Sequence, residues 1–231
     1  MNIILIGPPG AGKGTQAAAL EKTTGLKHIA SGDLFRSNML QGTDLGKRAQ
    51  SFVDRGELVA DEIVINMVLQ RVTEPDCQHG VIFDGFPRTR KQAAALIEGL
   101  HAQGEELQAV VALTVPRDVL LRRIAGRQTC AICQRPYNVF YTPSRLEATC
   151  DLCGGDLYTR SDDNLQTARH RLHVYSQETL PLIEYFRNLN LLHEVDAVGD
   201  VQIAIEHVTA AVALARPRRL NSSQMPAART P

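Results

Sequence analysis

Five short apolar runs recur along this chain, and segments in which apolar residues recur at helical spacing separate them. The runs lie at residues 3–6, 28–30, 81–83, 110–115 and 191–195. Apolar runs of this length are typical of strands that are buried on both faces of a parallel sheet. The alternation therefore predicts an α/β fold, with a doubly wound parallel five-stranded sheet and helices on both of its faces.

Two segments interrupt the alternation and predict two inserted mobile lobes. Residues 31–60 contain Phe35, Leu45 and Phe52 at roughly helical spacing, which predicts a small helical flap. Residues 127–163 are irregular and too long for a bare loop in a compact domain. Because the α/β pattern runs nearly from end to end, we expect residues 1–215 to form one domain that carries both lobes.

The helix after the second insertion has clear start signals. Ser161 is the candidate N-cap, and Asp162 and Asp163 would complement the helix dipole. The expected apolar stripe consists of Leu165, Ala168, Leu172 and Tyr175. Residues 216–231 mix proline, arginine and small polar residues without periodicity, which predicts a disordered tail. A nucleic-acid-binding arm is the alternative interpretation of this tail.

A glycine-rich segment, GPPGAGKGT at residues 7–15, follows the first apolar run directly. Such a turn between a strand and a helix can point several backbone N–H groups at one polyphosphate, and the helix N-terminus favours negative charge. Lys13 would reach the terminal phosphates. The segment indicates a P-loop, although its hydroxyl, on Thr15, comes one residue later than in the common pattern and leaves direct metal ligation open. A plain glycine turn is the alternative.

Polar segments follow the second and third apolar runs as well. They read SGD at residues 31–33 and DGFPR at residues 84–88. Ligands of doubly wound sheets bind outside the carboxyl ends of the strands. We therefore expect these two segments and the P-loop to face one crevice.

Charge is balanced in this chain of 231 residues, with 25 Lys and Arg against 25 Asp and Glu. No net charge therefore indicates a nucleic-acid or membrane partner. No apolar run approaches the length of a membrane span, and no basic leader precedes the first strand. We expect a cytoplasmic protein that binds neither nucleic acid nor membrane.

Four of the five cysteines form two Cys-x-x-Cys pairs, with 16 residues (134 to 149) between the pairs. They are Cys130, Cys133, Cys150 and Cys153. This spacing predicts a four-thiolate zinc site, which is structural because it leaves no open coordination position. Two redox disulfides are the alternative. Cys77 lies outside the cluster, and we interpret it as an inert small side chain.

Arginines stand close to these motifs, although a single arginine is usually a solvated surface charge. Arg123 and Arg127 are four residues apart and would share one side of a helix that continues that far. With these residues the chain resembles the adenylate kinase family, in the long form whose lid carries cysteines. The resemblance covers roughly residues 1–214 and rests on four motifs: GPPGAGKGT (7–15), SGDLFR (31–36), DGFPRT (84–89, with Gln92 behind it) and RIAGR (123–127).

The resemblance implies a P-loop NTPase-type fold in a monomer with the partners ATP, AMP and ADP. The implied reaction is reversible, Mg²⁺-dependent, in-line transfer of the terminal phosphoryl group of ATP to AMP, giving two ADP in a closed, water-excluded cleft. The implied ATP-binding residues are Gly10, Ala11, Gly12, Lys13, Gly14, Thr15, Arg127, Pro136, Tyr137 and Gly199. The implied AMP-binding residues are Ser31, Arg36, Glu57, Leu58, Val59, Gly85, Phe86, Pro87, Arg88, Gln92, Arg160 and Arg171. The implied catalytic residues are Lys13, Arg88, Arg123, Arg160 and Arg171, and Asp84 and Asp33 would hold Mg²⁺ through water.

Two other classes of protein compete with this interpretation. A kinase for UMP, CMP or GMP would share the fold and the chemistry, since the preference for adenine rests on the resemblance alone. A nucleic-acid-binding or partner-binding module with a zinc ribbon is disfavoured by the balanced charge and by the lack of basic and aromatic residues interleaved around the cysteines. A GTPase switch is disfavoured because the chain has no Asn-Lys-x-Asp motif.

Overall fold

A five-stranded parallel sheet forms the centre of the computed structural model, which describes residues 1–215. Its strands are β1 (Asn2–Ile6), β2 (Lys27–Ala30), β3 (Val81–Asp84), β4 (Leu107–Thr114) and β8 (Leu192–Asp196). They lie in the order β2-β3-β1-β4-β8, and every neighbouring pair is parallel. The predicted doubly wound sheet is confirmed, and β1, which leads into the glycine-rich loop, lies at its middle.

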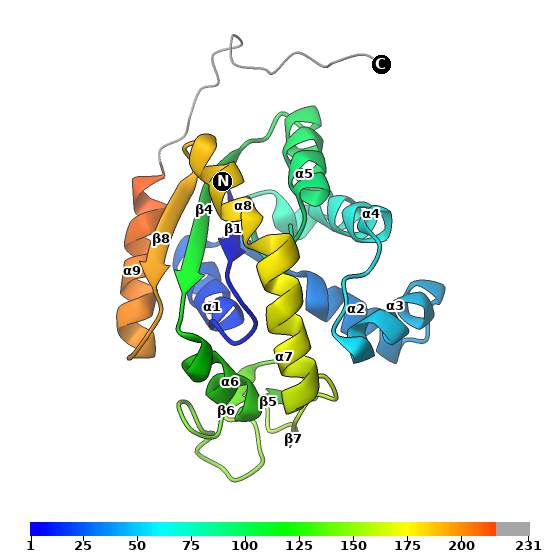
Figure 1. The fold of residues 1–231 in the computed structure, drawn as a ribbon, viewed down its shortest axis with the longest axis vertical. Helices are drawn as coiled ribbons and strands as arrows, with labels where there is room; N and C mark the ends of the chain where they lie inside the picture. The colour runs from blue at the N-terminus through cyan, green and yellow to red at the C-terminus, as the bar shows by residue number, and fades with distance from the viewer. Residues whose placement is uncertain (216–231) are drawn as a thin grey trace.

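Helices cover both faces of the sheet because successive side chains of each strand point to opposite faces. Ile3 and Leu5 pack with helices α1 and α9, whereas Ile4 and Ile6 pack with α4, α5 and α8. These helices are α1 (Lys13–Thr24), α4 (Asp61–Val72), α5 (Arg90–Ala102), α8 (Pro181–Asn188) and α9 (Val201–Leu214). Figure 1 shows α5 and α9 on opposite sides of the sheet. Each fully buried aliphatic side chain of β1 contributes about 1.5–3 kcal/mol.

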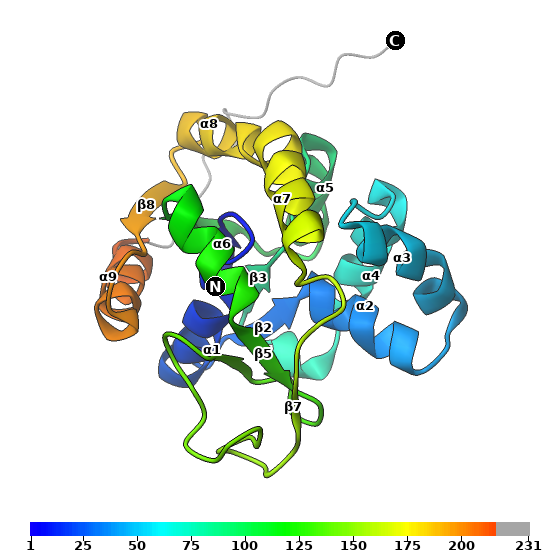
Figure 2. The ribbon, with the colours of Figure 1, turned by 60° about the horizontal axis from the view of Figure 1, so that its bottom comes forward.

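The first insertion contains two helices, α2 (Ser31–Leu40) and α3 (Asp44–Arg55). The hydroxyl of Thr43 caps α3 by accepting a hydrogen bond from the Gly46 N–H at 3.1 Å. A Cβ atom at Gly46 would lie only 2.3 Å from the carbonyl oxygen of Asn38, so α3 can approach the end of α2 only with glycine there. In Figure 2, α2 and α3 project to one side of the molecule.

The second insertion is a small antiparallel sheet with the strand order β6-β5-β7. Its strands are β5 (Arg127–Cys130), β6 (Pro136–Asn138) and β7 (Leu157–Tyr158). Its buried cluster comprises Cys130, Tyr137 and Cys150, with Leu157 packed against them. So small a core supplies little hydrophobic stabilisation to the lobe.

One long helical segment connects this lobe to the far side of the sheet. Helix α7 (Leu165–Val174) continues through a π-helical turn, Tyr175–Thr179, into α8. Figure 1 shows α7 and α8 crossing the molecule in yellow and orange. Helix α6 (Arg117–Ala125) precedes the lobe, and a short 3₁₀ turn, Pro75–Cys77, precedes β3.

The predicted start of α7 is wrong by three residues. Asn164, rather than Ser161, is the N-cap, and its side-chain oxygen accepts a hydrogen bond from the Thr167 N–H at 2.9 Å. The chain before Asn164 is a turn that Asp162 and Asp163 hold through ion pairs with arginines. Because the helix starts later, Leu165 is 54% exposed and does not belong to the apolar stripe.

Among residues 1–215, no helix is both long and apolar enough to span a membrane. The predicted disordered tail at residues 216–231 lies outside the residues that the structure describes.

The corrected N-cap can be tested by two matched alanine variants. Asn164→Ala removes the capping oxygen and should lower the free energy of unfolding by about 1 kcal/mol. Ser161→Ala should change it by less than about 0.5 kcal/mol, because this exposed side chain caps nothing. Urea unfolding followed by circular dichroism measures both, and equal losses in the two variants would contradict the assignment.

Candidate active site at the carboxyl edge of the sheet

The glycine-rich loop joins β1 to the N-terminus of α1 at the carboxyl edge of the sheet. Gly10 has a φ of +84°, and a Cβ atom there would lie 2.9 Å from the carbonyl oxygen of Leu120 in α6. Lys13 folds back over the loop, and its ammonium donates to the carbonyl oxygens of Gly7 at 2.8 Å and Pro8 at 3.1 Å. No side chain in residues 1–215 caps α1, so its first N–H groups remain available to an anion.

Positive charges crowd around Lys13. Burial lowers the pKa of its ammonium to about 8; the carboxylate of Asp84 opposes the shift, and the positive charges of Arg88, Arg171 and Arg127 add to it. Burial and the other arginines also lower the pKa of Arg171 to about 10, although its carboxylate neighbours oppose the change. The edge of the sheet therefore concentrates cations that the surrounding protein solvates poorly.

Two aspartates before α7 neutralise part of this charge. Asp163, whose side chain is fully buried, accepts from Arg127 Nε at 2.8 Å and from Arg171 Nη1 at 3.4 Å. Asp162 accepts from Arg171 Nη1 at 2.7 Å. The sequence interpretation of these two aspartates as partners of the helix dipole missed this role as counter-ions.

Two other arginines at this edge form no ion pair within residues 1–215. Arg88 donates from Nε to the carbonyl oxygen of Gly85 at 2.8 Å, and Arg160 donates from Nε to the Thr129 hydroxyl at 3.0 Å. Burial lowers the pKa of both, that of Arg160 to about 10. Buried charges are normally paired, so this site has a surplus of positive charge that an anionic ligand can balance.

A pocket opens between the flap and the end of β3. It is lined by Ser31, Gly32, Phe35, Arg36, Val53, Gly56, Glu57, Leu58, Val59, Val64, Gly85, Arg88, Gln92, Asp162 and Arg171. An adjoining hollow on the P-loop side is lined by Gly7, Pro9, Lys13 and Pro87 among others, and it shares Arg88 and Arg171 with the pocket. The structure therefore brings together most of the predicted AMP-site residues. Of the remainder, Phe86 belongs to the core, and Arg160 lines neither hollow.

Hydrogen bonds hold the pocket wall together. The Ser31 hydroxyl donates to the carbonyl oxygen of Gly85 at 2.8 Å. The amide of Gln92 accepts from the Arg88 N–H at 2.8 Å and donates to Asp61 at 2.7 Å. The hydroxyl of Thr89 also donates to Asp61, at 3.1 Å. Sequence reasoning missed Asp61, because an acid in the first turn of a helix is ordinary there.

Sequence reasoning also missed His28, which lies on strand β2. Its Nε2 lies 3.3 Å from a carboxylate oxygen of Asp84. Although burial opposes the cation, this hydrogen bond and the charge of Asp84 raise the pKa of His28. Asp84 also lies over the start of α1, because a Cβ atom at Gly14 would be 3.5 Å from its carboxylate. The predicted partner of Asp84 in metal binding, Asp33, forms an ion pair with Arg36.

Four other predicted residues, Arg123, Pro136, Tyr137 and Gly199, line neither hollow. Helix α6 ends at Ala125, so Arg127 begins β5 and does not share a helix side with Arg123. Arg123 donates to the carbonyl oxygen of Ala197 at 2.9 Å, and its guanidinium lies 5.6 Å from the centre of the Tyr141 ring. Gly199 lies in the loop before α9, with a φ of +86°. Pro136 and Tyr137 lie on β6, and the Tyr137 hydroxyl points to Cys150.

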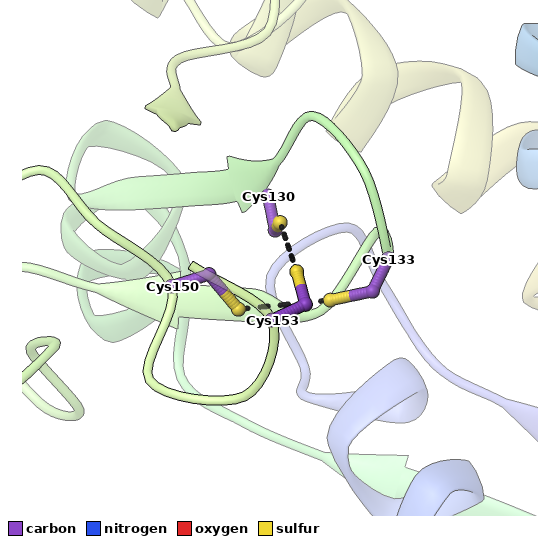
Figure 3. A group of neighbouring side chains, drawn as sticks. All are labelled: Cys130, Cys133, Cys150 and Cys153. Carbon is purple, nitrogen blue, oxygen red and sulfur yellow. Dashed lines mark hydrogen bonds between the residues drawn. The ribbon is translucent and has the colours of Figure 1, made fainter. Parts of the chain in front are cut away.

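The four cysteines of the lobe gather as the spacing predicts. Their sulfur atoms lie within 4.8 Å of one another, with Cys130 and Cys153 3.4 Å apart and Cys133 and Cys150 3.6 Å apart. Figure 3 shows these side chains converging from two loops. Tetrahedral zinc with bonds of about 2.3 Å places its sulfurs roughly 3.8 Å apart, so the cluster fits this metal. All five cysteines of the chain are free, so the disulfide alternative is wrong for this structure.

A glycine-rich loop between a central parallel strand and a helix, with surplus cations at the same edge, defines a P-loop phosphotransferase. Comparison with known proteins narrows this class, because the sequence model of the family described as adenylate kinase matches residues 5–191. The chain belongs to the adenylate kinase family and is a nucleoside monophosphate kinase.

Relatives from distant organisms match most of the chain. An adenylate kinase of Streptomyces avermitilis is 49% identical over 203 residues, covering 87% of this chain and 92% of that protein. One of Archaeoglobus fulgidus is 46% identical over 202 residues, covering 87% and 93%. One of Desulfitobacterium hafniense (strain DCB-2) is 45% identical over 212 residues, covering 92% and 98%.

The low pKa of Lys13 predicts proton uptake when nucleotide binds. With a pKa of about 8 in the free protein, roughly three quarters of the Lys13 side chains are neutral at pH 8.5, and phosphate contacts should restore their charge. Calorimetric titration with ATP at pH 8.5, in two buffers of different ionisation enthalpy, should therefore report uptake of about that fraction of a proton. At pH 7 the uptake should nearly vanish, and a buffer-independent heat at pH 8.5 would contradict the assignment.

Proposed function

We propose that this kinase transfers the terminal phosphoryl group of ATP reversibly to AMP, giving two ADP, with Mg²⁺ accompanying ATP. The observation that carries the proposal is the surplus of buried positive charge, since Lys13, Arg88 and Arg160 have no ion-pair partner among the described residues. Two nucleotides supply a chain of phosphates that balances such a surplus.

The P-loop side of the site is the proposed ATP site. Backbone N–H groups of residues 10–15 and the ammonium of Lys13 would hold the phosphates, and Arg127 would exchange Asp163 for a phosphate oxygen. Pro136, Tyr137 and Gly199 remain proposed contacts to the base and ribose, and the direction of the Tyr137 hydroxyl leaves its backbone as the contacting group.

The pocket beneath the flap is the proposed AMP site. Arg36 and Arg88 both line it, and the buried Nε of Arg36 has no hydrogen-bond partner among the described residues. The backbone at residues 57–59 and the amide of Gln92 would contact the base. Arg88 and Arg171 line both hollows, so they can contact a phosphoryl group that passes from one nucleotide to the other.

Charge stabilisation is the main contribution that this chain can make to catalysis. Lys13, Arg88, Arg160 and Arg171 would surround the equatorial oxygens on which negative charge spreads in the transition state. Arg123 would have to leave the carbonyl oxygen of Ala197 to join them. Mg²⁺ would neutralise the phosphates, and Asp84 and Asp33 would hold it through water. The acceptor phosphate is largely ionised at pH 7, so no general base is required.

Closure of the two lobes would keep water out of the reaction. Arg127 and Arg160 come from the second lobe or its edge, and Arg36 comes from the flap. Binding of phosphates to these side chains would draw both lobes over the nucleotides, as in other kinases whose lids exclude water. The cysteine lobe would keep its shape through structural zinc, because its own core is so small.

We propose further that the protein is a cytoplasmic monomer. The free cysteines support the cytoplasmic location, and the two nucleotide sites in one chain support the monomer.

The substrate preference is tested by phosphoryl transfer from ATP with Mg²⁺ to AMP, CMP, UMP and GMP in parallel. We expect AMP to be preferred at least about tenfold in kcat/KM, since a site built for one base edge rejects others that leave its polar groups unpaired. ATP hydrolysis without acceptor should be negligible. Preference for another base would indicate a nucleoside monophosphate kinase with a different substrate. Rapid hydrolysis would contradict the water-excluding closure.

Arg88→Ala should lower kcat more than about 100-fold, a loss of about 2.7 kcal/mol or more in transition-state stabilisation. The fold should persist, because within residues 1–215 the side chain makes one hydrogen bond, to a carbonyl oxygen of its own loop. Arg90→Ala, two residues along, is the control and should leave kcat within about twofold, since Arg90 is exposed and packs on the Tyr185 ring. A loss below tenfold in Arg88→Ala would exclude the proposed role.

A further inference from the structure

Tyr137 is the one large aromatic side chain in the buried cluster of the cysteine lobe. Its ring packs with Cys130, Cys150 and Leu157, and the residue is only 5% exposed. Every other ring of residues 127–158 is more exposed, including those of Phe140, Tyr141 and Tyr158. The tyrosine hydroxyl is thus buried beside the metal ligands, where a polar group needs hydrogen-bond partners.

The hydroxyl has two partners, and their chemistry sets the direction of its hydrogen bonds. Its oxygen accepts from the Asp151 N–H at 2.8 Å, which leaves the hydroxyl proton free to be donated. The second partner is the sulfur of Cys150, at 3.4 Å. A cysteine that binds zinc has lost its proton, so in the loaded site the sulfur can only accept this hydrogen bond.

Cys150 is distinguished from the other three ligands by this contact. Among the four cysteines, all of which the structure describes, its sulfur is the one that lies within hydrogen-bond distance of a side chain of another residue type. The Leu152 N–H also donates to it, at 3.4 Å. Tyr137 lies on β6, which pairs with β5, so its hydroxyl connects the strand after the first cysteine pair to the loop of the second pair.

We propose that Tyr137 is a positioning residue of the zinc site, whose hydroxyl orients the sulfur of Cys150 and fastens the loop of the second cysteine pair to β6. The inference rests on the zinc site proposed above. It differs from the role in ATP binding that the resemblance implies for Tyr137, because a side chain engaged with Cys150 is not available to a nucleotide. Partners of this kind typically change metal affinity 10-fold to 100-fold when they are removed.

The test is Tyr137→Phe, which removes the hydroxyl and keeps the ring. The matched control is Tyr158→Phe in the same lobe, whose hydroxyl makes no hydrogen bond to any described residue. Zinc affinity is measured on the full chain by competition with a chromophoric chelator. We expect Tyr137→Phe to bind zinc about 10-fold to 100-fold more weakly, and the control to stay within about twofold of the parent protein.

A second readout separates positioning of the ligand from simple packing. Loading with Co²⁺ gives a thiolate-to-metal charge-transfer band, and loss of a hydrogen bond to the sulfur should shift this band to longer wavelength. A residue that only fills space would leave the band unchanged. The rate of zinc loss to excess chelator provides the same comparison if the zinc-free variant fails to fold.

The outcomes distinguish this inference from the proposals on which it depends. A parent protein that binds no zinc would overturn both the metal site and the role of Tyr137. Zinc affinity and a cobalt spectrum that Tyr137→Phe leaves unchanged would overturn the role of Tyr137 alone. An increased KM for ATP with unchanged zinc affinity would instead assign the side chain to the nucleotide.

Discussion

Repulsion among cations at the carboxyl edge of the sheet is the constraint on which the rest of this structure depends. Burial lowers the pKa of Lys13 and that of Arg171, and the positive charge of Arg88 lowers both further. The fold tolerates this arrangement because carbonyl oxygens and the carboxylates of Asp162 and Asp163 accept their hydrogen bonds. Phosphate oxygens are stronger partners than carbonyls, so the energy stored in this repulsion favours nucleotide binding.

Strand β5 joins this charge cluster to the cysteine site within four residues. Arg127 at its start pairs with Asp163, Thr129 accepts a hydrogen bond from Arg160, and Cys130 at its end belongs to the sulfur cluster. A lobe with so small a core could not hold these side chains in register through hydrophobic packing alone. The proposed zinc ion would therefore support the site at a distance, by keeping in one conformation the strand that carries Arg127 and Thr129, the partner of Arg160.

Predictions from local sequence patterns were correct where the structure depends on residues close together in the chain. The strands, the P-loop and the paired cysteines appear where the pattern predicts them, although β4 begins at Leu107, three residues earlier than expected. The predicted N-cap of α7 was wrong because Ser161 and Asn164 are equally good capping residues. Ion pairs with Arg127 and Arg171 decided between them. The partners of Arg127 and Arg171 were likewise misread as residues that complement a helix dipole.

The sequence by itself determined the class of sheet, the place of the phosphate loop and the set of sulfur ligands. Each depends on the spacing of residues along the chain, because that spacing determines the hydrophobic period and the chemistry of the turns. Only the tertiary structure decided that His28 meets Asp84, that Gln92 meets Asp61, and that Tyr137 points to Cys150. These contacts join residues 56, 31 and 13 positions apart, and their geometry arises from how the elements pack, which no local pattern encodes.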